Sequence, residues 1–281
     1  MIQTIRERRG LQILGLLFPG GFVLIVFFLI PLILIGVMSF VDKAGAFTLE
    51  GYRRSFESLY VNLFIQSIWI SFLTTVIALL ISYPVALFMA RLPKQWRSAS
   101  VFLVMIPFWT NFLVRTYALQ YLMRPNGPIN ALLQSLGLIS EPLQMLNTSG
   151  AVLIGLVYGN LPFMILPIYT SLEKFDWTMI EAANDLGANV VRAFIRIMLP
   201  LTAPGVLAGS ILTFVPAIGS YVTADLMGGG KATMLGRVIA GQFEQAQNWT
   251  FGSAMSLLLM VIVTIFAIIY FRAGRGERVA L

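Results

Sequence analysis

The chain has 281 residues, of which 58% are hydrophobic and 11% are charged, and its formal net charge is +7 at pH 7. A soluble domain carries about 25% charged residues, so this composition indicates an integral membrane protein. The chain contains no cysteine and no histidine, which excludes disulfides, thiolate catalysis, and zinc or haem held by these residue types.

Six apolar stretches are long enough to cross a bilayer, whose hydrocarbon core takes about 20 residues of helix. The third stretch reaches this length only by continuing past Arg115. We therefore expect an all-α, polytopic membrane protein in which residues 1–281 form a single transmembrane domain. The predicted spans are residues 12–40, 64–90, 99–122, 150–171, 201–223 and 251–271.

The first apolar run follows the basic segment MIQTIRERRG, as the core of a signal peptide would. This run is too long for a signal peptide, and no small-x-small cleavage site closes it. We interpret it as a retained first transmembrane helix.

The basic residues stand at the ends of the apolar runs, where they indicate orientation in the membrane. The short loop RLPKQWR, residues 91–97, is basic and contains no acid, so it marks the cytoplasmic side. We expect both termini to be cytoplasmic. Because the positive charges do not gather into one patch, nucleic acid is not an expected partner.

Residues 173–200, between the fourth and fifth predicted spans, are amphipathic. Gly187 interrupts the helical pattern, so we expect two short helices that meet near this glycine, with Asp176 as the N-cap of the first. A helix lying on the membrane surface and a docking site for a partner protein both fit this pattern. Apolar residues recur with helical spacing at Met179, Ala183, Leu186, Val190, Ala193 and Ile197.

The outer loop 223–250 contains GGGKAT, which looks like a phosphate-binding loop. The residue after Lys231 is Ala232, Asp225 stands where the first glycine belongs, and no strand precedes the loop. We therefore expect this chain to bind no nucleotide, so that any ATP site belongs to a separate subunit.

The segment from Glu181 to Pro200 follows the pattern E-A-A-x3-G-x9-I-x-L-P. This pattern resembles the EAA motif of ABC-importer permease subunits, which also lies between the fourth and fifth spans. Over most of its length the chain is similar to the spermidine/putrescine type of these permeases. The similarity is densest in PFWTNFLVRTYAL, GLVYGNLPFMILPIYTSLEK, EAANDLGA, FIRIMLPLTAPG and DLMGGGKATMLG.

The resemblance implies a type I ABC importer permease in a bacterial inner membrane, with a cytoplasmic coupling helix within residues 173–200. The implied partners are two copies of a cytoplasmic ATPase, a second related permease and a periplasmic substrate-binding protein. The chain would be a transport subunit without catalytic residues, metal or cofactor, because ATP would bind the ATPase. The coupling residues carried over are Glu181, Ala182, Ala183, Asp185 and Gly187.

A path for polyamines, which are flexible cations, would offer oxygen atoms and aromatic faces. For the aromatic candidates, packing or interfacial anchoring is the alternative, and the asparagines would otherwise bridge helices. Arg115 is expected to snorkel to the outer surface, with a substrate carboxylate as its alternative partner. The candidate path residues are Trp109, Asn111, Tyr158, Asn160, Glu173 and Tyr221.

Three other functions compete with a polyamine importer. The same architecture would serve another small solute, such as an opine or an amino acid. A stand-alone secondary transporter would favour internal repeats or a charged coupling site within the membrane, and neither is found in the sequence. A simple membrane anchor does not explain the complete EAA pattern or the prolines within the spans.

Overall fold

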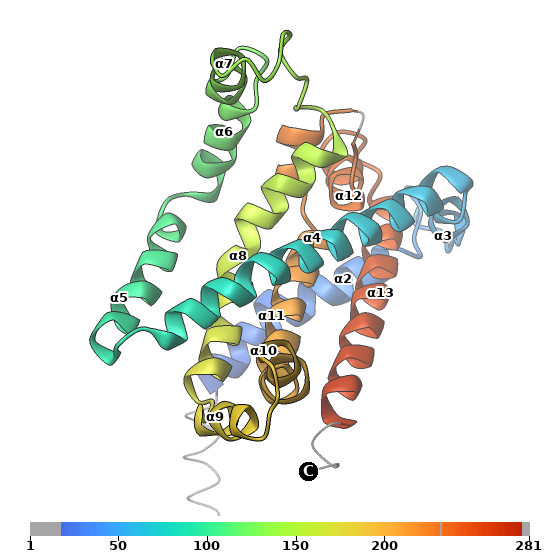
Figure 1. Ribbon diagram of the computed structural model, residues 1–281. Helices are drawn as coiled ribbons and strands as arrows, with labels where there is room; N and C mark the ends of the chain where they lie inside the picture. Colours follow the sequence, from blue (N-terminus) through green and yellow to red (C-terminus); the bar gives the residue numbers. More distant parts are fainter. Residues whose placement is uncertain (1–17, 231, 277–281) are drawn as a thin grey trace, which may run out of the picture. The chain divides into compact units, whose positions relative to one another are not determined.

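The computed structural model describes residues 18–230 and 232–276, and this part of the chain is helical apart from loops and an isolated bridge between Val41 and Phe47 (Figure 1). The basic N-terminal segment, the beginning of the first predicted span and Lys231 lie outside the described residues. The elements are η1 (Ile25–Leu29), α2 (Ile30–Met38), α3 (Glu50–Ser55), α4 (Ser58–Arg91), α5 (Lys94–Met105), η2 (Ile106–Trp109), α6 (Phe112–Leu122), α7 (Pro128–Ser135), α8 (Ser149–Glu173), α9 (Thr178–Asp185), α10 (Val190–Ala193), η3 (Phe194–Met198), α11 (Leu199–Ile218), η4 (Ala224–Gly228), α12 (Leu235–Glu244) and α13 (Trp249–Gly276).

The described helices include five that are long and apolar enough to cross a membrane, and a bent pair makes a sixth crossing when its two halves are counted together. This confirms the predicted all-α polytopic fold, with short helices between the fourth and fifth crossings. The five helices are Phe18–Met38, Ser58–Arg91, Ser149–Glu173, Val190–Ile218 and Trp249–Tyr270, and the bent pair is Lys94–Trp109 with Phe112–Leu122.

The third predicted span, residues 99–122, falls within the bent pair of helices. Its halves meet at 85°, and the break follows Pro107, which stands in the first turn of η2. Thr110 and Asn111 are extended there, and the Asn111 side chain accepts a hydrogen bond from the Leu113 N–H at 2.8 Å. The asparagine therefore starts a new helix where the hydropathy pattern alone suggested a continuous one.

The helix that carries the fifth predicted span, residues 201–223, runs from Val190 to Ile218, so it starts before that span and ends before its last residues. Pro200 and Pro204 lie inside this helix. A π-helical turn, η3, precedes both prolines. Such turns open the hydrogen-bond ladder, so the amide donors that proline lacks are accommodated without ending the helix.

The chain divides into two compact units, the first within Met1–Tyr60 and Gly241–Val261 and the second within Val61–Ala240 and Ile262–Leu281. In the first unit, the Tyr52 hydroxyl donates to Ser39 Oγ at 2.8 Å, and Thr250 Oγ1 donates to the Val41 carbonyl at 2.6 Å. These bonds fasten the loop that follows the first crossing. Within this unit, the described part of the first crossing leaves nearly all of its apolar side chains exposed.

In the second unit, α8 and α11 lie side by side at very close range (Figure 1). A β-carbon added to Gly205 would meet the Pro167 carbonyl oxygen at 2.5 Å, and one added to Gly209 would meet the Met164 carbonyl oxygen at 3.1 Å. Glycine is therefore required for the two backbones to approach, which is the common packing mode of membrane helices.

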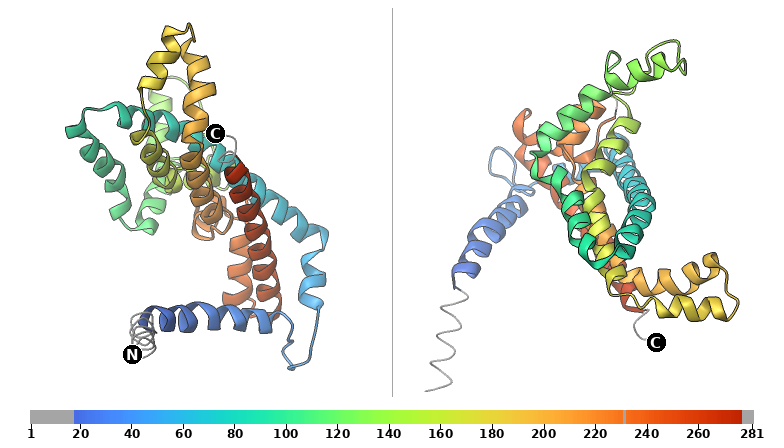
Figure 2. Two further views of the ribbon diagram at one scale, coloured as in Figure 1. Left: turned by 90° about the horizontal axis from the view of Figure 1, so that it is seen from below. Right: turned by 60° about the vertical axis from the view of Figure 1, so that its left-hand side comes forward.

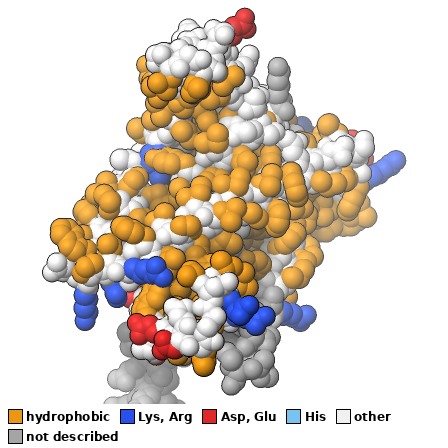
Figure 3. Space-filling view, viewed as in Figure 1, with side chains coloured by type: hydrophobic (Ala, Val, Ile, Leu, Met, Phe, Trp, Pro, Cys, Tyr) orange, Lys and Arg blue, Asp and Glu red, His pale blue; other side chains and the backbone are white. Residues whose placement is uncertain are grey.

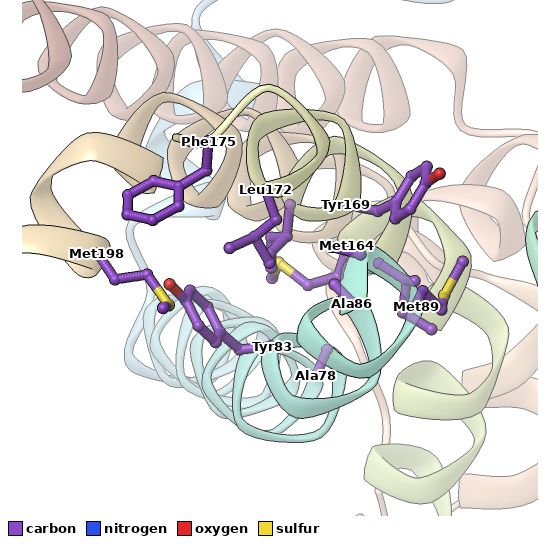
Figure 4. Close-up of a cluster of buried hydrophobic side chains, with 12 residues drawn as sticks. Ala78, Tyr83, Ala86, Met89, Met164, Tyr169, Leu172, Phe175 and Met198 are labelled. Carbon is purple, nitrogen blue, oxygen red and sulfur yellow. The ribbon is translucent and has the colours of Figure 1, made fainter. Parts of the chain in front are cut away.

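A buried apolar cluster joins α4, α8 and the start of the fifth crossing (Figure 4). The hydroxyl groups of Tyr83 and Thr202 share a hydrogen bond of 2.8 Å inside it, so the cluster has no unpaired polar group at this point. Its members are Ala78, Tyr83, Ala86, Met89, Ala90, Met164, Ile165, Ile168, Tyr169, Leu172, Phe175 and Met198.

A second buried cluster lies at the other end of α8, where η4 packs against it. Ser67 Oγ accepts the Leu235 N–H at 2.8 Å, and Arg237 Nε pairs with Asp225 Oδ1 at 2.5 Å. These bonds anchor the segments before and after the glycine-rich loop that begins at Gly228. The cluster consists of Ile70, Met123, Ala151, Val152, Leu156, Ala224, Met227, Ala232 and Met234.

Candidate functional site

The EAA motif folds into a hairpin of two short helices, α9 and α10, which we call the EAA hairpin (residues 178–193). Gly187 has a φ of +82°, a conformation that residues with a side chain rarely adopt. Its N–H donates to the Asn184 carbonyl at 2.9 Å, and the Ala188 N–H donates to the Ala183 carbonyl at 2.9 Å. This bond pair is a Schellman motif, so the glycine ends α9 as the sequence predicted.

Two side chains cap the hairpin helices. The Asp176 carboxylate accepts the Thr178 N–H at 3.0 Å and the Thr178 hydroxyl at 2.8 Å, and these bonds lower the pKa of Asp176. The helix α9 begins at Thr178, so Trp177 and not the predicted Asp176 occupies the N-cap position. This difference of one residue is within the usual uncertainty of helix ends. Asn189 caps α10 by accepting the Arg192 N–H at 2.8 Å.

The turn of the EAA hairpin carries large, exposed apolar side chains. Leu186 is 89% exposed, Val190 79% and Val191 63%. Figure 2 shows the hairpin standing clear of α8 and α11, and Figure 3 shows charged side chains gathered near α9, next to an apolar surface over α4 and α8. An exposed apolar turn among charges is typical of a protein-docking surface.

The predicted coupling residues do not all lie on the exposed side of the hairpin. Glu181, Ala182, Asp185 and Gly187 are exposed, whereas Ala183 is only 8% exposed and packs inward. Close approach by a partner would therefore occur at Ala182, while the small side chain of Ala183 lets α9 lie near its own bundle.

The hairpin is tied to the membrane helices by aromatic contacts. The Phe194 ring meets the Tyr83 ring edge-on at a centroid distance of 5.3 Å, and the Arg91 guanidinium lies 5.2 Å from the Trp177 ring centroid. An apolar cavity of about 400 Å³ separates the hairpin from the end of α4. It is lined by Leu87, Arg91, Ile180, Asn184, Val190, Val191, Ala193, Phe194 and Met198.

A second cavity, of about 300 Å³, lies among α6, α8 and the end of α11, within the membrane-crossing part of the chain. We call it the membrane cavity. Its polar groups come from Arg115, Asn160, Ser220 and Thr223, and aromatic rings form much of the remaining wall. The full lining is Phe108, Phe112, Arg115, Gly155, Leu156, Gly159, Asn160, Phe163, Pro216, Ser220 and Thr223.

Two of the predicted path residues lie at this cavity. Asn160 lines it, and its Nδ2 donates to the Leu156 carbonyl at 2.7 Å, so its side chain is held along its own helix. Tyr158 lines a narrow pocket that shares Phe112, Arg115, Gly155 and Gly159 with the membrane cavity.

The other four predicted path residues do not line the cavity. Trp109 is 72% exposed and meets Phe102 edge-on, and Asn111 caps α6. Glu173 accepts a hydrogen bond of 2.9 Å from the Tyr169 hydroxyl, and Tyr221 is exposed. Sequence reasoning missed Phe108, Phe112, Ser220 and Thr223, because they come from separate segments that only tertiary packing brings together.

Arg115 does not snorkel to the outer end of α6 as the sequence suggested. Its guanidinium carbon lies 4.2 Å from the centroid of the Phe108 ring, seven residues earlier in the chain. Side chains on a helix lean toward its N-terminus, and the 85° bend of the third crossing brings Phe108 within reach. The arginine therefore faces the membrane cavity.

Several apolar crossings, a motif hairpin at one end of the bundle and a polar cavity within it define a multi-pass transport subunit. The chain belongs to the family described as "Binding-protein-dependent transport system inner membrane component", which it matches over residues 82–278. Members of this family are transport components and not enzymes.

Curated relatives are similar along nearly the whole chain. The chain is 43% identical over 258 residues to the spermidine/putrescine transport system permease protein PotB of Haemophilus influenzae, with 90% of each chain covered. It is 41% identical over 258 residues to the protein of the same name from Escherichia coli K12, covering 90% of this chain and 94% of the relative. These similarities confirm the permease family predicted from the EAA motif.

Solved structures share the fold at low identity. A bacterial ABC transporter involved in the import of the acidic polysaccharide alginate matches with a TM-score of 0.76 and 15% identity, over 98% of this chain and 99% of that chain. A methionine ABC transporter, MetNI, in an inward-facing conformation matches with a TM-score of 0.52 and 18% identity, over 79% and 95%. The fold is therefore that of an ABC importer permease.

Proposed function

We propose that this chain is a permease subunit of an ATP-driven importer and forms half of the translocation path for a polyamine such as spermidine or putrescine. The observation that carries the coupling role is the EAA hairpin, whose exposed apolar turn stands beyond the bundle. The polyamine assignment is supported by relatives of 41% and 43% identity that are named for spermidine/putrescine transport.

The complex contains two copies of a cytoplasmic ABC ATPase, a second related permease and a periplasmic substrate-binding protein. The EAA hairpin docks on one ATPase through Leu186 and Val190, with Glu181, Ala182 and Asp185 at the edge of the contact and Gly187 setting the turn. ATP binds to the ATPase, so this chain carries no cofactor.

The chain lies in a bacterial inner membrane with both termini in the cytoplasm. This orientation is supported by the basic loop of residues 91–97 and by the hairpin, because both then lie on the side of the ATPase. The glycine-rich loop that follows η4 faces the periplasm, where the binding protein delivers its cargo.

The membrane cavity is the part of the path that this chain supplies. Asn160, Ser220 and Thr223 offer oxygen atoms, and Phe108, Phe112 and Phe163 offer ring faces that attract ammonium groups. Tyr158 borders the passage. Such groups hold a cation weakly, which suits a permease because a binding protein supplies the affinity. Trp109, Asn111, Glu173 and Tyr221 stay predictions for other stages of the path.

The complete complex in proteoliposomes tests this function. We expect labelled spermidine to accumulate only with ATP and the binding protein present, and unlabelled putrescine to compete while amino acids and opines do not. The control is the same complex with an ATPase subunit that cannot hydrolyse ATP. Competition by an amino acid but not by putrescine would contradict the polyamine assignment, and accumulation without the ATPase would contradict the importer itself.

A further inference from the structure

The Arg115 guanidinium is incompletely paired inside the membrane cavity. Its Nε and Nη1 atoms are buried and have no hydrogen-bond partner among the described residues. The rings of Phe108 and Phe112 lie 4.2 and 5.9 Å from its central carbon, which stabilises the charge but does not satisfy the N–H groups. A buried donor without an acceptor costs about 1–3 kcal/mol, and more when the group is charged.

The described residues bring no carboxylate to the cavity. The residues that line it include no aspartate or glutamate. In the same compact unit, Asp225 pairs with Arg237, Glu173 accepts from Tyr169, and Asp176 accepts from Thr178. A carboxylate that pairs with Arg115 in this cavity would therefore have to come from another molecule.

A polyamine cannot supply this acceptor, because it is a cation and is repelled by the guanidinium. The surroundings favour a protein carboxylate, because its negative charge complements the guanidinium and arginine pairs with carboxylates more strongly than lysine does. The cavity of about 300 Å³ has room for one such side chain beside the passage.

Building on the proposed function, we propose that an aspartate or glutamate of the second permease subunit enters the membrane cavity and pairs with Arg115. The cavity is then part of the contact between the two permeases as well as of the path. The pair neutralises the positive charge that would otherwise oppose a cation in the passage.

Cross-linking in the complete complex identifies the partner. A photoreactive benzoyl-phenylalanine at Phe112, which lines the cavity beside Arg115, should form a covalent product with the second permease on illumination. Mass spectrometry should locate the linked peptide within a few residues of an aspartate or glutamate. A product with lipid alone, or with no other chain, would overturn the proposal.

Charge variants test the pairing itself. Arg115→Gln should lower the yield of the complex about 30-fold or more, because it leaves a buried carboxylate unpaired. The amount of this chain inserted when it is expressed alone should be unchanged, since the variant also removes the unpaired donors. Arg124→Gln is the matched control, because Arg124 is exposed in an outer loop, and it should assemble normally. If Arg115→Gln also lowered the amount of this chain inserted when it is expressed alone, Arg115 would act within this chain, and the pairing with a second permease would be overturned.

The decisive variant reverses both charges. Arg115→Glu should abolish assembly, and replacing the cross-linked carboxylate of the second permease with arginine should restore at least about a tenth of the wild-type complex. Failure of every carboxylate near the cross-link to rescue Arg115→Glu would overturn the proposal. Assembly is measured without substrate, so this result does not depend on polyamine uptake. A failure of the proposed function would be seen in the uptake experiment instead.

Discussion

Gly187 controls the geometry of the EAA hairpin through its backbone conformation. Steric crowding around the residue plays no part. A β-carbon at this position would meet nothing within 4 Å, yet the φ of +82° disfavours any residue with a side chain. The glycine lets the Ala183 and Asn184 carbonyls be satisfied while the chain reverses direction. Leu186 and Val190 are exposed at the same turn because of this reversal.

Substitution of Gly187 should therefore depend on the conformational preference of the new residue. Gly187→Val should reduce uptake about tenfold or more, because the left-handed conformation costs about 1–2 kcal/mol for ordinary residues and more for a β-branched one. Gly187→Asn should retain most activity, since asparagine tolerates this conformation. ATP-driven uptake is compared at equal membrane insertion. Equal activity of the two variants would show that backbone conformation at Gly187 does not matter.

At the scale of helices, the pairing of α8 with α11 connects the hairpin to the cavity. The helix α8 carries Asn160 in the cavity and ends just before the hairpin, while α11 continues from the hairpin through η3. Gly205 and Gly209 bring the two helices into close contact. A shift of the hairpin would therefore move both helices as one body.

Widening this contact should weaken the fold. Gly205→Ala places a methyl group 2.5 Å from the Pro167 carbonyl oxygen, so the helices must separate or distort. We expect a destabilisation of about 1–3 kcal/mol, as for other overpacked interiors. Gly219→Ala is the matched control, because its nearest neighbour would be 3.9 Å away. Thermal denaturation of the purified complex measures the difference, and equal melting temperatures would contradict the close-contact account.

The elements were predictable to different degrees. Apolar runs identified the crossings, because burial in lipid demands long uncharged helices. The size of the break after Pro107 could not be predicted from hydropathy, because residues 106–112 remain apolar or uncharged and the capping geometry of Asn111 starts the next helix. The helix of the fifth crossing starts before the predicted span because a π-helical turn carries it past Pro200.

At the scale of the molecule, the EAA hairpin was predictable from its motif, whereas the membrane cavity was not. The motif is local, so its glycine and caps act on neighbouring residues. The cavity combines Phe112, Asn160 and Ser220 from three separate segments, and only tertiary packing brings them together. The direction of Arg115 likewise depends on the bend of the third crossing.

The central claim is that the EAA hairpin docks on an ATPase subunit and transmits its movement to the membrane helices. The natural chain contains no cysteine, so a single Leu186→Cys variant with a short thiol-directed photo-cross-linker reports only on the hairpin turn. In the assembled, transport-competent complex we expect a covalent product with the ATPase subunit. The control, Leu136→Cys at an exposed site after α7, should give no such product. Efficient labelling of Leu186→Cys without any ATPase product in an actively transporting complex would contradict the claim.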